Sequence, residues 1–596
     1  MNDPTDPPAR AVALFRKGDV EAARQVAEDA LAQSGETAPL RHFLGVISCR
    51  CGDLEEGISH LERAAELVPH DPATLLMLMR ALIDAGRPRD ALLRPFRGDE
   101  LPKPVLLTLW RTRAEAAHLA DDMHQEADAL ERIVVLDPAD SLARDLLVQL
   151  LLSLGRPEAA LKQINFMPLT RDRERMRSLV LSRMRRFDEA TAVDAAILDA
   201  DPQDFESWLS LVVLADQMAD RPRLLTMAEK AEDAGFPRAE LDFVRSLIAK
   251  LEGQTEKALA LARTSEVRGE PARRFGLIAV LADRLGHADE AFDAATAKAQ
   301  AMPDIDAWRR RAKLHRTELE RVAAATTPEW VAGWSPPSSS IRPSPVFLVG
   351  FPRSGTTLLD TFLMGHPKVT VVEEEQMLAV AAQEFGDAVD LGQADPATIA
   401  KARTAYFAEL DRHQRPSGAT QLVIDKLPLG MSGAAYIHRL FPDARIIFAQ
   451  RHPADSVLSN FLQSFRMNDA MANFLDIGDA AQFYDVAMRL WVRSREELRL
   501  NVLDLVYEEL VEDPEAALRP VVDWLGLSWD ATLLDHRRTA ANRGTIVTPS
   551  YDQVTQPIHR RAVGRWKHYA ERLAPILPLL DRWAQHLGYG PMTTKR

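Results

Sequence analysis

The stretch PVFLVGFPRSGTT, residues 345–357, determines the fold of the C-terminal part of this 596-residue chain. It predicts a short buried strand, a loop bounded by Gly350 and Gly355, and a helix that begins at two threonines. Unpaired N–H groups and the positive end of the dipole make a helix N-terminus an anion site. The loop has the G-x-x-x-x-G spacing of nucleotide-binding loops, but Thr-Thr follows where that motif has Lys-Ser/Thr. The stretch therefore predicts binding of a phosphate-like group, with Arg353 as its cation.

Composition limits the class of protein. The length exceeds what one hydrophobic core supports, so several domains or a repeat array are expected. The net charge of −14 disfavours nucleic acid as a partner, because its phosphates would be repelled. Cys49 and Cys51, the two cysteines, have the spacing of neither a disulfide framework nor a zinc site and are expected in a helix. No apolar run approaches the length of a membrane span and no signal core is visible, so we expect a cytoplasmic protein.

Residues 1–325 show an internal repeat. Gly18, Gly52 and Gly86 are each 34 residues apart, and the phase continues less regularly to Gly286. Small residues near Gly52 would let two antiparallel helices approach, and the glycine itself would make the turn. The pattern resembles tetratricopeptide repeats, which implies an all-α superhelix of about eight or nine helix pairs. Such an array binds peptides or proteins on its concave face, or serves as a spacer or oligomerisation scaffold; both remain open. The charge run at 171–175 is typical of a solvated helix face.

Residues 326–344 form a Pro/Ser-rich linker in which the proline density predicts no helix. From 345 to 596 short apolar strands alternate with helices, which predicts an α/β domain with a parallel sheet covered on both faces. The expected strands are 346–349, 369–372, 422–424, 445–449 and 502–506. Ligands bind at the carboxyl ends of such strands.

Charged residues follow several of these strands. The three adjacent carboxylates at 373–375 suit either proton abstraction or, as we favour on the residues alone, an acidic helix start. Lys426 could neutralise charge on a leaving group or be a solvated loop lysine. Arg451, ahead of a helix that carries Ser459, predicts a second phosphate site. Two such sites suggest a ligand with two separated anionic ends.

The motifs GFPRSGTT and RHPADSVLS, about a hundred residues apart, resemble the paired donor-binding motifs of the sulfotransferases. This resemblance covers about residues 345–590. It implies that 3′-phosphoadenosine-5′-phosphosulfate is the donor substrate. The first loop would hold its 5′-phosphosulfate, and the later arginine and serine its 3′-phosphate. The donor-binding residues implied by these two motifs are Arg353, Ser354, Gly355, Thr356, Thr357, Arg451 and Ser459.

Further segments are similar to the protein-tyrosine sulfotransferase branch and its repeat-bearing bacterial relatives. HPKVTVVEEEQML places the catalytic glutamate of that branch on Glu374, and KLPLG gives Lys426. VYEELVEDPEAAL gives Tyr507. TPSYDQVTQPI with GRW gives Ser550 near the sulfonate and Arg565 for the 3′-phosphate. Two positions, Gln463 and Gln556, depart from the pattern of the branch.

The resemblance implies in-line sulfuryl transfer to a phenolic or alcoholic hydroxyl, with Glu374 as base and no metal. His366 and His452 are weaker candidates for the base, because each adjoins a proline in a turn. The acceptor is a peptide, protein or small hydroxyl compound, and the repeats mildly favour a protein. The alternatives are a carbohydrate or other small acceptor, a small-molecule kinase, and a repeat scaffold with an inactive domain. The kinase interpretation requires a lysine after Gly355, which is absent.

Overall fold

The computed structural model describes residues 7–96, 101–335, 342–413, 421–542, 558 and 560–592. The chain forms two compact units, residues 1–214 and 215–596. The division at 326–344 rests on sequence pattern and stays a proposal. Residues 215–325 belong to the same compact unit as the C-terminal sheet.

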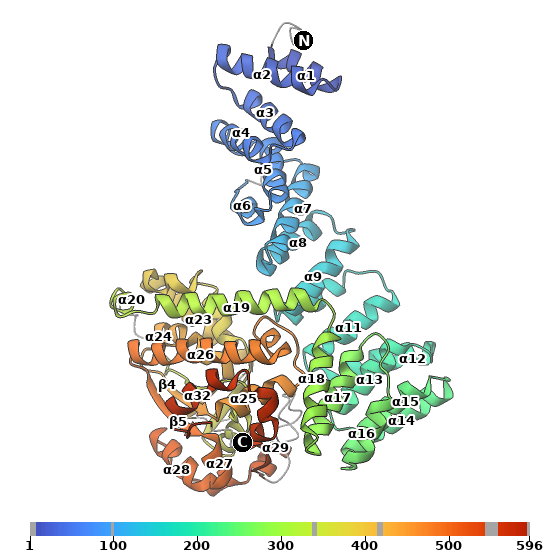
Figure 1. Ribbon diagram of the computed structural model, residues 1–596, viewed down its shortest axis with the longest axis vertical. Coiled ribbons are helices and arrows are strands. Elements are labelled where there is room, and N and C mark those ends of the chain that lie inside the picture. The colour runs from blue at the N-terminus through green and yellow to red at the C-terminus, as the bar shows by residue number, and fades with distance from the viewer. Residues whose placement is uncertain are drawn as a thin grey trace. The chain divides into compact units, whose positions relative to one another are not determined.

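The first unit consists of helices that pack in antiparallel pairs (Figure 1). The α3–α4 pair shows why small residues recur. A Cβ atom at Gly57 would lie 2.3 Å from the Cys49 sulfur, and one at Gly45 would lie 2.6 Å from a Leu61 carbon. The described helices are α1 (Pro7–Arg16), α2 (Val20–Ser34), α3 (Ala38–Cys51), α4 (Leu54–Leu67), α5 (Pro72–Asp84), α6 (Pro88–Leu92), α7 (Lys103–Leu119), α8 (Met123–Leu136), α9 (Ser141–Ser153), α10 (Pro157–Ile164), α11 (Arg171–Arg183), α12 (Phe187–Ala200) and the greater part of α13 (Phe205–Gln217).

A turn residue with left-handed backbone recurs at the spacing of the sequence repeat. Gly52 and Gly86, which follow helices, have φ of 94° and 72°. Where the sequence lacks a glycine, another residue within one position adopts this conformation: Asp121, Arg185 and Ala219 have φ between 52° and 59°. Such backbone is unfavourable for L-residues, so the packing of the helix pairs must hold it.

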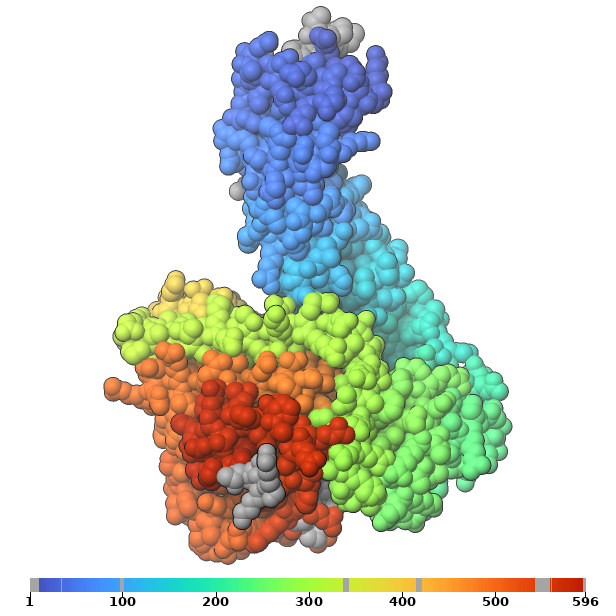
Figure 2. Space-filling view, in the orientation of Figure 1, coloured from blue at the N-terminus to red at the C-terminus, as the bar shows by residue number. Residues whose placement is uncertain are grey.

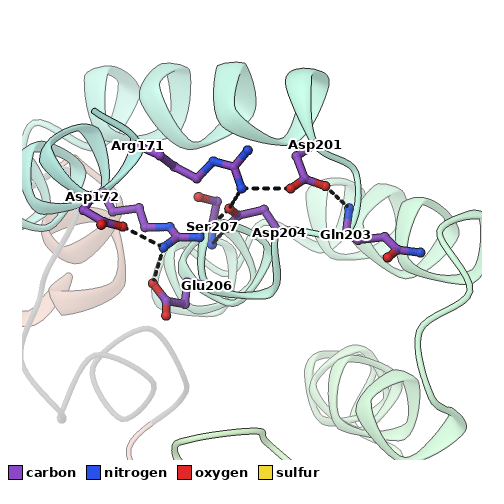
Figure 3. Close-up of polar contacts among 8 residues, drawn as sticks. Arg171, Asp172, Asp201, Gln203, Asp204, Glu206 and Ser207 are labelled. Carbon is purple, nitrogen blue, oxygen red and sulfur yellow. Dashed lines mark hydrogen bonds and ion pairs between the residues drawn. The ribbon is translucent and has the colours of Figure 1, made fainter. Parts of the chain in front are cut away.

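Ion pairs join α11 to the end of α12 and to the residue just before α13 (Figure 3). Arg175 lies 2.5 Å from Asp204, and Arg171 lies 2.8 Å from Asp201 and 3.4 Å from Asp204. Asp204 also accepts a hydrogen bond from the Ser207 N–H at 3.0 Å, and its side chain has no exposed surface. The charged residues at 171–175 therefore form ion pairs with neighbouring helices as well as a solvated helix face.

We expect Asp204→Ala to destabilise this helix pair by about 2–3 kcal/mol, since it removes a helix cap and charge-assisted hydrogen bonds together. Hydrogen exchange of residues 171–213 under native conditions measures the loss. Asp201→Ala is the matched control, because Asp201 is more exposed and, besides a hydrogen bond from the Gln203 N–H, its one ion pair among the described residues is with Arg171; its effect should stay below about 1 kcal/mol. Equal effects of the two substitutions would contradict the role given to Asp204.

The second unit contains a five-stranded parallel sheet of order β2-β3-β1-β4-β5. Its strands are β1 (Val346–Val349), β2 (Val369–Glu373), β3 (Leu422–Lys426), β4 (Arg445–Gln450) and β5 (Asn501–Val506). Each expected strand is present to within two residues at its ends. Because all five run in one direction, the residues that follow β1, β2, β3, β4 and β5 share one edge of the sheet. The α/β fold is confirmed.

The helices of this unit precede, separate or follow the strands of this sheet along the chain. Before it lie α14 (Arg221–Asp233), α15 (Arg238–Leu251), α16 (Thr255–Thr264), α17 (Pro271–Arg284), α18 (Ala288–Gln300), α19 (Ile305–Ala325) and α20 (Pro328–Ala332). Within and after it lie α21 (Thr356–Met364), α22 (Met377–Ala382), α23 (Pro396–His413), α24 (Ala434–Leu440), α25 (Pro453–Leu462), α26 (Ile477–Glu497), α27 (Tyr507–Glu512), α28 (Pro514–Trp524), α29 (His536–Asn542), α31 (Ala570–Leu573) and α32 (Leu577–His586), with short 3₁₀ turns between them. No described helix is long and apolar enough to cross a membrane.

The predicted linker contains a helix, α20, contrary to the prediction from its proline density. Pro328 stands at the first position of α20, where its missing N–H costs nothing, and the Thr327 hydroxyl caps the helix. Trp330 donates to the Val389 carbonyl at 2.8 Å and packs edge-to-face on Trp334. The two tryptophans thereby fasten this segment to the sheet domain.

Candidate active site

The loop from β1 to α21 needs its glycines for two close approaches. A Cβ atom at Gly350 would lie 2.6 Å from the Ala449 carbonyl oxygen. One at Gly355, whose φ is 92°, would lie 2.4 Å from the ring of Tyr507. The loop backbone therefore runs against β4 and α27, and α21 opens at Thr356 with N–H groups that have no intrahelical acceptor.

The two predicted phosphate-binding motifs meet in one place. The Arg353 Nε donates to the Ser459 hydroxyl at 3.2 Å, and the Arg451 Nη1 donates to the Arg353 carbonyl at 2.7 Å. Arg451 also lies over the ring of Tyr507, with its Cζ 4.8 Å from the centroid. Arg353 itself has a φ of 67°, a strained value for a residue with a side chain. The motifs thus build one continuous site.

This site concentrates positive charge. Burial, and then the nearby Arg451 and Arg565, lower the pKa of Arg353 to about 10. Arg451 is bound to two carbonyl oxygens, those of Arg353 and Ala562, which do not neutralise it. Several buried donors have no hydrogen-bond partner among the described residues: Arg451 Nε, Arg565 Nε and Nη2, and the Ser354 hydroxyl. Buried donors without acceptors are costly, so the arrangement suits an anionic ligand.

A second cluster lies where β2 and β3 end. The Lys426 Nζ is 2.7 Å from a Glu374 oxygen and 3.2 Å from an Asp360 oxygen. Lys426 and Asp360 have no exposed side-chain surface, whereas 36% of the Glu374 side chain is exposed. Burial lowers the pKa of Lys426, but the two carboxylates outweigh it, and the net pKa is raised. The lysine is therefore held as a cation, and one of its two partners faces outward.

The three adjacent glutamates have different surroundings. Glu373 ends β2, Glu374 has a φ of 50° and contacts Lys426, and Glu375 lies 3.6 Å from a nitrogen of His413. The following helix, α22, has no acidic residue in its first turn. The segment is thus a strand end and a strained turn rather than the acidic helix start that the residues alone had favoured.

Some predicted residues lie elsewhere or outside the described part. Ser550 and Gln556 are not among the described residues. The Gln463 carbonyl accepts from Lys298 at 2.6 Å. His366 accepts from the Lys368 N–H and contacts the Ser528 carbonyl. His452 stacks on Trp566 at 5.3 Å. Both histidines therefore have packing or hydrogen-bonding roles.

Sequence reasoning missed Asp360. Its signal was available, since it is the only charged residue of α21, a helix that is otherwise apolar or hydroxyl-bearing. A charge in such a helix is rare without a partner. What the sequence did not supply was the identity of that partner, which β3 contributes 66 residues later in the chain.

Beside this cluster, burial raises the pKa of Asp425 to about 7, although a hydrogen bond from Tyr406 at 2.7 Å opposes the shift. A carboxyl whose pKa is raised in the folded state binds a proton on folding. This happens at pH values between its pKa in the unfolded chain, near 4, and its pKa in the folded protein, about 7. Stability should therefore fall by roughly 2–4 kcal/mol as the pH rises from 4 to 8. Asp425→Asn should remove most of this slope in urea unfolding at several pH values. Asp411→Asn, an exposed control, should not, and an unchanged slope in Asp425→Asn would contradict the assignment.

The geometry defines a class of protein: a parallel α/β domain with an arginine cluster and a helix N-terminus at the carboxyl ends of its strands, beside a lysine–carboxylate cluster. Residues 345–531 match the model of the sulfotransferase family. This part of the chain is therefore similar to the sulfotransferase family. Among the described residues no group of histidine, cysteine or carboxylate side chains is arranged to hold a metal.

Curated relatives match the C-terminal part. Protein-tyrosine sulfotransferase 2 of Gallus gallus is 26% identical over 266 residues, 41% of this chain and 69% of that protein. Protein-tyrosine sulfotransferase 1 of Homo sapiens is 27% identical over 274 residues, 41% of this chain and 70% of that protein. An uncharacterized protein of Aquifex aeolicus is 26% identical over 285 residues, 45% of this chain and only 36% of that protein. The domain is thus distantly similar to protein-tyrosine sulfotransferases.

Solved structures resemble parts of the chain weakly. A sulfotransferase from Mycobacterium avium covers 56% of this chain and 96% of its own, with 16% identity and a TM-score of 0.27. A tetratricopeptide repeat protein from Parabacteroides merdae covers 46% of this chain and 97% of its own, with 13% identity and a TM-score of 0.23. At these scores the likeness adds nothing to the fold described above.

Proposed function

We propose that this protein transfers a sulfuryl group from 3′-phosphoadenosine-5′-phosphosulfate to an acceptor hydroxyl, with a tyrosine of a peptide or protein as the favoured acceptor. The observation that carries the proposal is the cluster of Arg353, Arg451 and Arg565, in which Arg451 Nε and Arg565 Nε and Nη2 are buried and have no acceptor among the described residues. One nucleotide with a 5′-phosphosulfate and a 3′-phosphate would supply several anionic oxygens to such a site. Similarity to the protein-tyrosine sulfotransferases supports the same donor.

The proposed reaction is an in-line displacement at sulfur. The acceptor oxygen forms a bond to sulfur, while the bond from sulfur to the bridging oxygen of the donor breaks and its electron pair stays on the 5′-phosphate. Glu374, which is partly exposed and held by Lys426, takes the acceptor proton. Lys426, Arg353 and the first N–H groups of α21 stabilise charge on the leaving phosphate and the sulfuryl oxygens. Ser550 stays a proposed contributor of one hydrogen bond.

The repeats give the second part of the proposal. A stack of helix pairs offers a long surface for an extended chain, which favours a peptide or protein acceptor over a carbohydrate or other small acceptor. A partner protein on the same surface is the other use that we keep. The cytoplasmic location stays a prediction.

Isothermal titration tests the donor. We expect micromolar binding of 3′-phosphoadenosine-5′-phosphate, much weaker binding of ATP, and loss of the former in Arg451→Ala. Arg445→Ala is a matched control, since this arginine, at the opposite end of β4 from Arg451, donates to the Trp524 carbonyl away from the cluster. ATP binding as strong as that of the bisphosphate would support the kinase alternative. Absence of binding by both would support an inactive scaffold.

A further inference from the structure

The helical repeats reach the proposed donor site within the second compact unit. Helices α17 and α18, drawn in green, lie against the orange and red C-terminal segments (Figures 1 and 2). Asp283, at the end of α17, is 3.1 Å from Arg565 Nη1 and accepts a hydrogen bond from the Tyr569 hydroxyl at 2.7 Å. Both side chains of the ion pair are mostly buried, with 18% and 16% exposure. A residue of the repeats thus pairs directly with an arginine of the anion site.

The contact leaves one edge of the Arg565 guanidinium without a hydrogen-bond partner among the described residues. Asp283 engages Nη1, while Nε and Nη2 are buried and have no partner among the described residues. Nε and Nη2 form the edge of a guanidinium that binds carboxylates and phosphates in a two-pronged manner. Asp283 therefore fixes the side chain from the far side and leaves two parallel donors for an anion. The negative charge of Asp283 is compensated by Arg565 Nη1 and by the hydrogen bond from the Tyr569 hydroxyl.

A second contact fixes the neighbouring helix. The buried Lys298 of α18 donates to the carbonyls of Phe461 and Gln463, at 3.0 and 2.6 Å, at the end of α25. A cation at a helix C-terminus satisfies free carbonyls and complements the dipole. Phe292 of α18 packs on Phe461 with ring centroids 4.9 Å apart. Helix α25 carries Ser459, so two helices of the repeats hold two components of one site.

We propose that Asp283 is a positioning residue for the group that recognises the 3′-phosphate, and that the helix pair α17–α18 is part of the donor site. This inference rests on the proposed function. It assigns to the last repeats a role in nucleotide selectivity, separate from any role in binding an acceptor or a partner. Asp283 acts through Arg565 and does not touch the nucleotide.

The test compares two ligands on the full chain. 3′-Phosphoadenosine-5′-phosphate and adenosine 5′-phosphate differ only in the 3′-phosphate, so the ratio of their affinities measures its recognition. We expect Asp283→Ala to lower affinity for the bisphosphate about 3- to 10-fold, the size of losing one immobilised side chain, and to leave the monophosphate unchanged. Asp283→Asn, which keeps the shape, should lie between wild type and alanine. Asp289→Ala on α18, which breaks an exposed pair with Arg572, is the matched control and should keep the wild-type ratio.

The outcomes separate the two proposals. A wild-type protein that binds both nucleotides equally, or binds neither, overturns the proposed function itself. A wild-type protein that prefers the bisphosphate, with an unchanged ratio in Asp283→Ala and Asp283→Asn, overturns only the positioning role. If the alanine variant does not fold, the ratio in Asp283→Asn decides. An equal loss of both ligands in that variant also counts against the inference, because it would show a general structural role.

Discussion

Replacing Glu374 by glutamine is expected to lower the turnover number of sulfuryl transfer by about 10²–10⁴, the usual contribution of a positioned general base. The amide keeps the shape and a contact to Lys426 but takes up no proton. Affinity for 3′-phosphoadenosine-5′-phosphate should change by less than about threefold, because the donor is held by the arginine cluster and by α21. Turnover with a tyrosine-containing peptide or a phenol as acceptor, together with titration of the nucleotide, gives both quantities.

The neighbouring glutamate provides the control. Glu375 pairs with His413 and does not contact Lys426, so Glu375→Gln should leave turnover within about threefold of wild type. Similar losses in the two variants would indicate that the acidic segment acts through its charge and not through Glu374 as a base. An unchanged rate in Glu374→Gln would transfer the role of base to another group.

The sheet and the glycine-bounded loop after β1 could be predicted from the sequence because their causes are local. Each strand is a short apolar run, and a parallel order brings the residues after β1, β3 and β4 to one edge. The loop glycines likewise predict that another part of the chain lies close to the loop backbone. The sequence does not predict that Tyr507 is the residue next to Gly355.

The remaining part of the site depends on long-range packing. Lys426 is a candidate because it lies at a strand end. Its buried partner Asp360 lies on α21, whose other residues are apolar or carry hydroxyls, so the local sequence does not point to a charged pair there. Asp283 is 282 residues before Arg565, and nothing in its helical repeat distinguishes it from a surface acid. Burial and pairing of this kind are properties of the assembled core, so pattern and spacing do not disclose them.

Lys426→Met is expected to destabilise the second unit by about 3–5 kcal/mol, because it leaves the buried carboxylate of Asp360 without its counter-charge. The partly exposed Glu374 can be solvated and should add little to this loss. Urea unfolding followed by tryptophan fluorescence and circular dichroism measures it. The exposed Lys368→Met is the control and should change stability by less than about 1 kcal/mol.

Adding Asp360→Asn to Lys426→Met should restore most of the lost stability, since no buried charge then remains unpaired. Turnover should not return with it, because the cation proposed to stabilise the leaving phosphate is still missing. The double variant thereby separates two roles of one lysine. Recovery of both stability and turnover would show that Lys426 only balances Asp360, and the leaving group would then depend on Arg353 and the start of α21 alone.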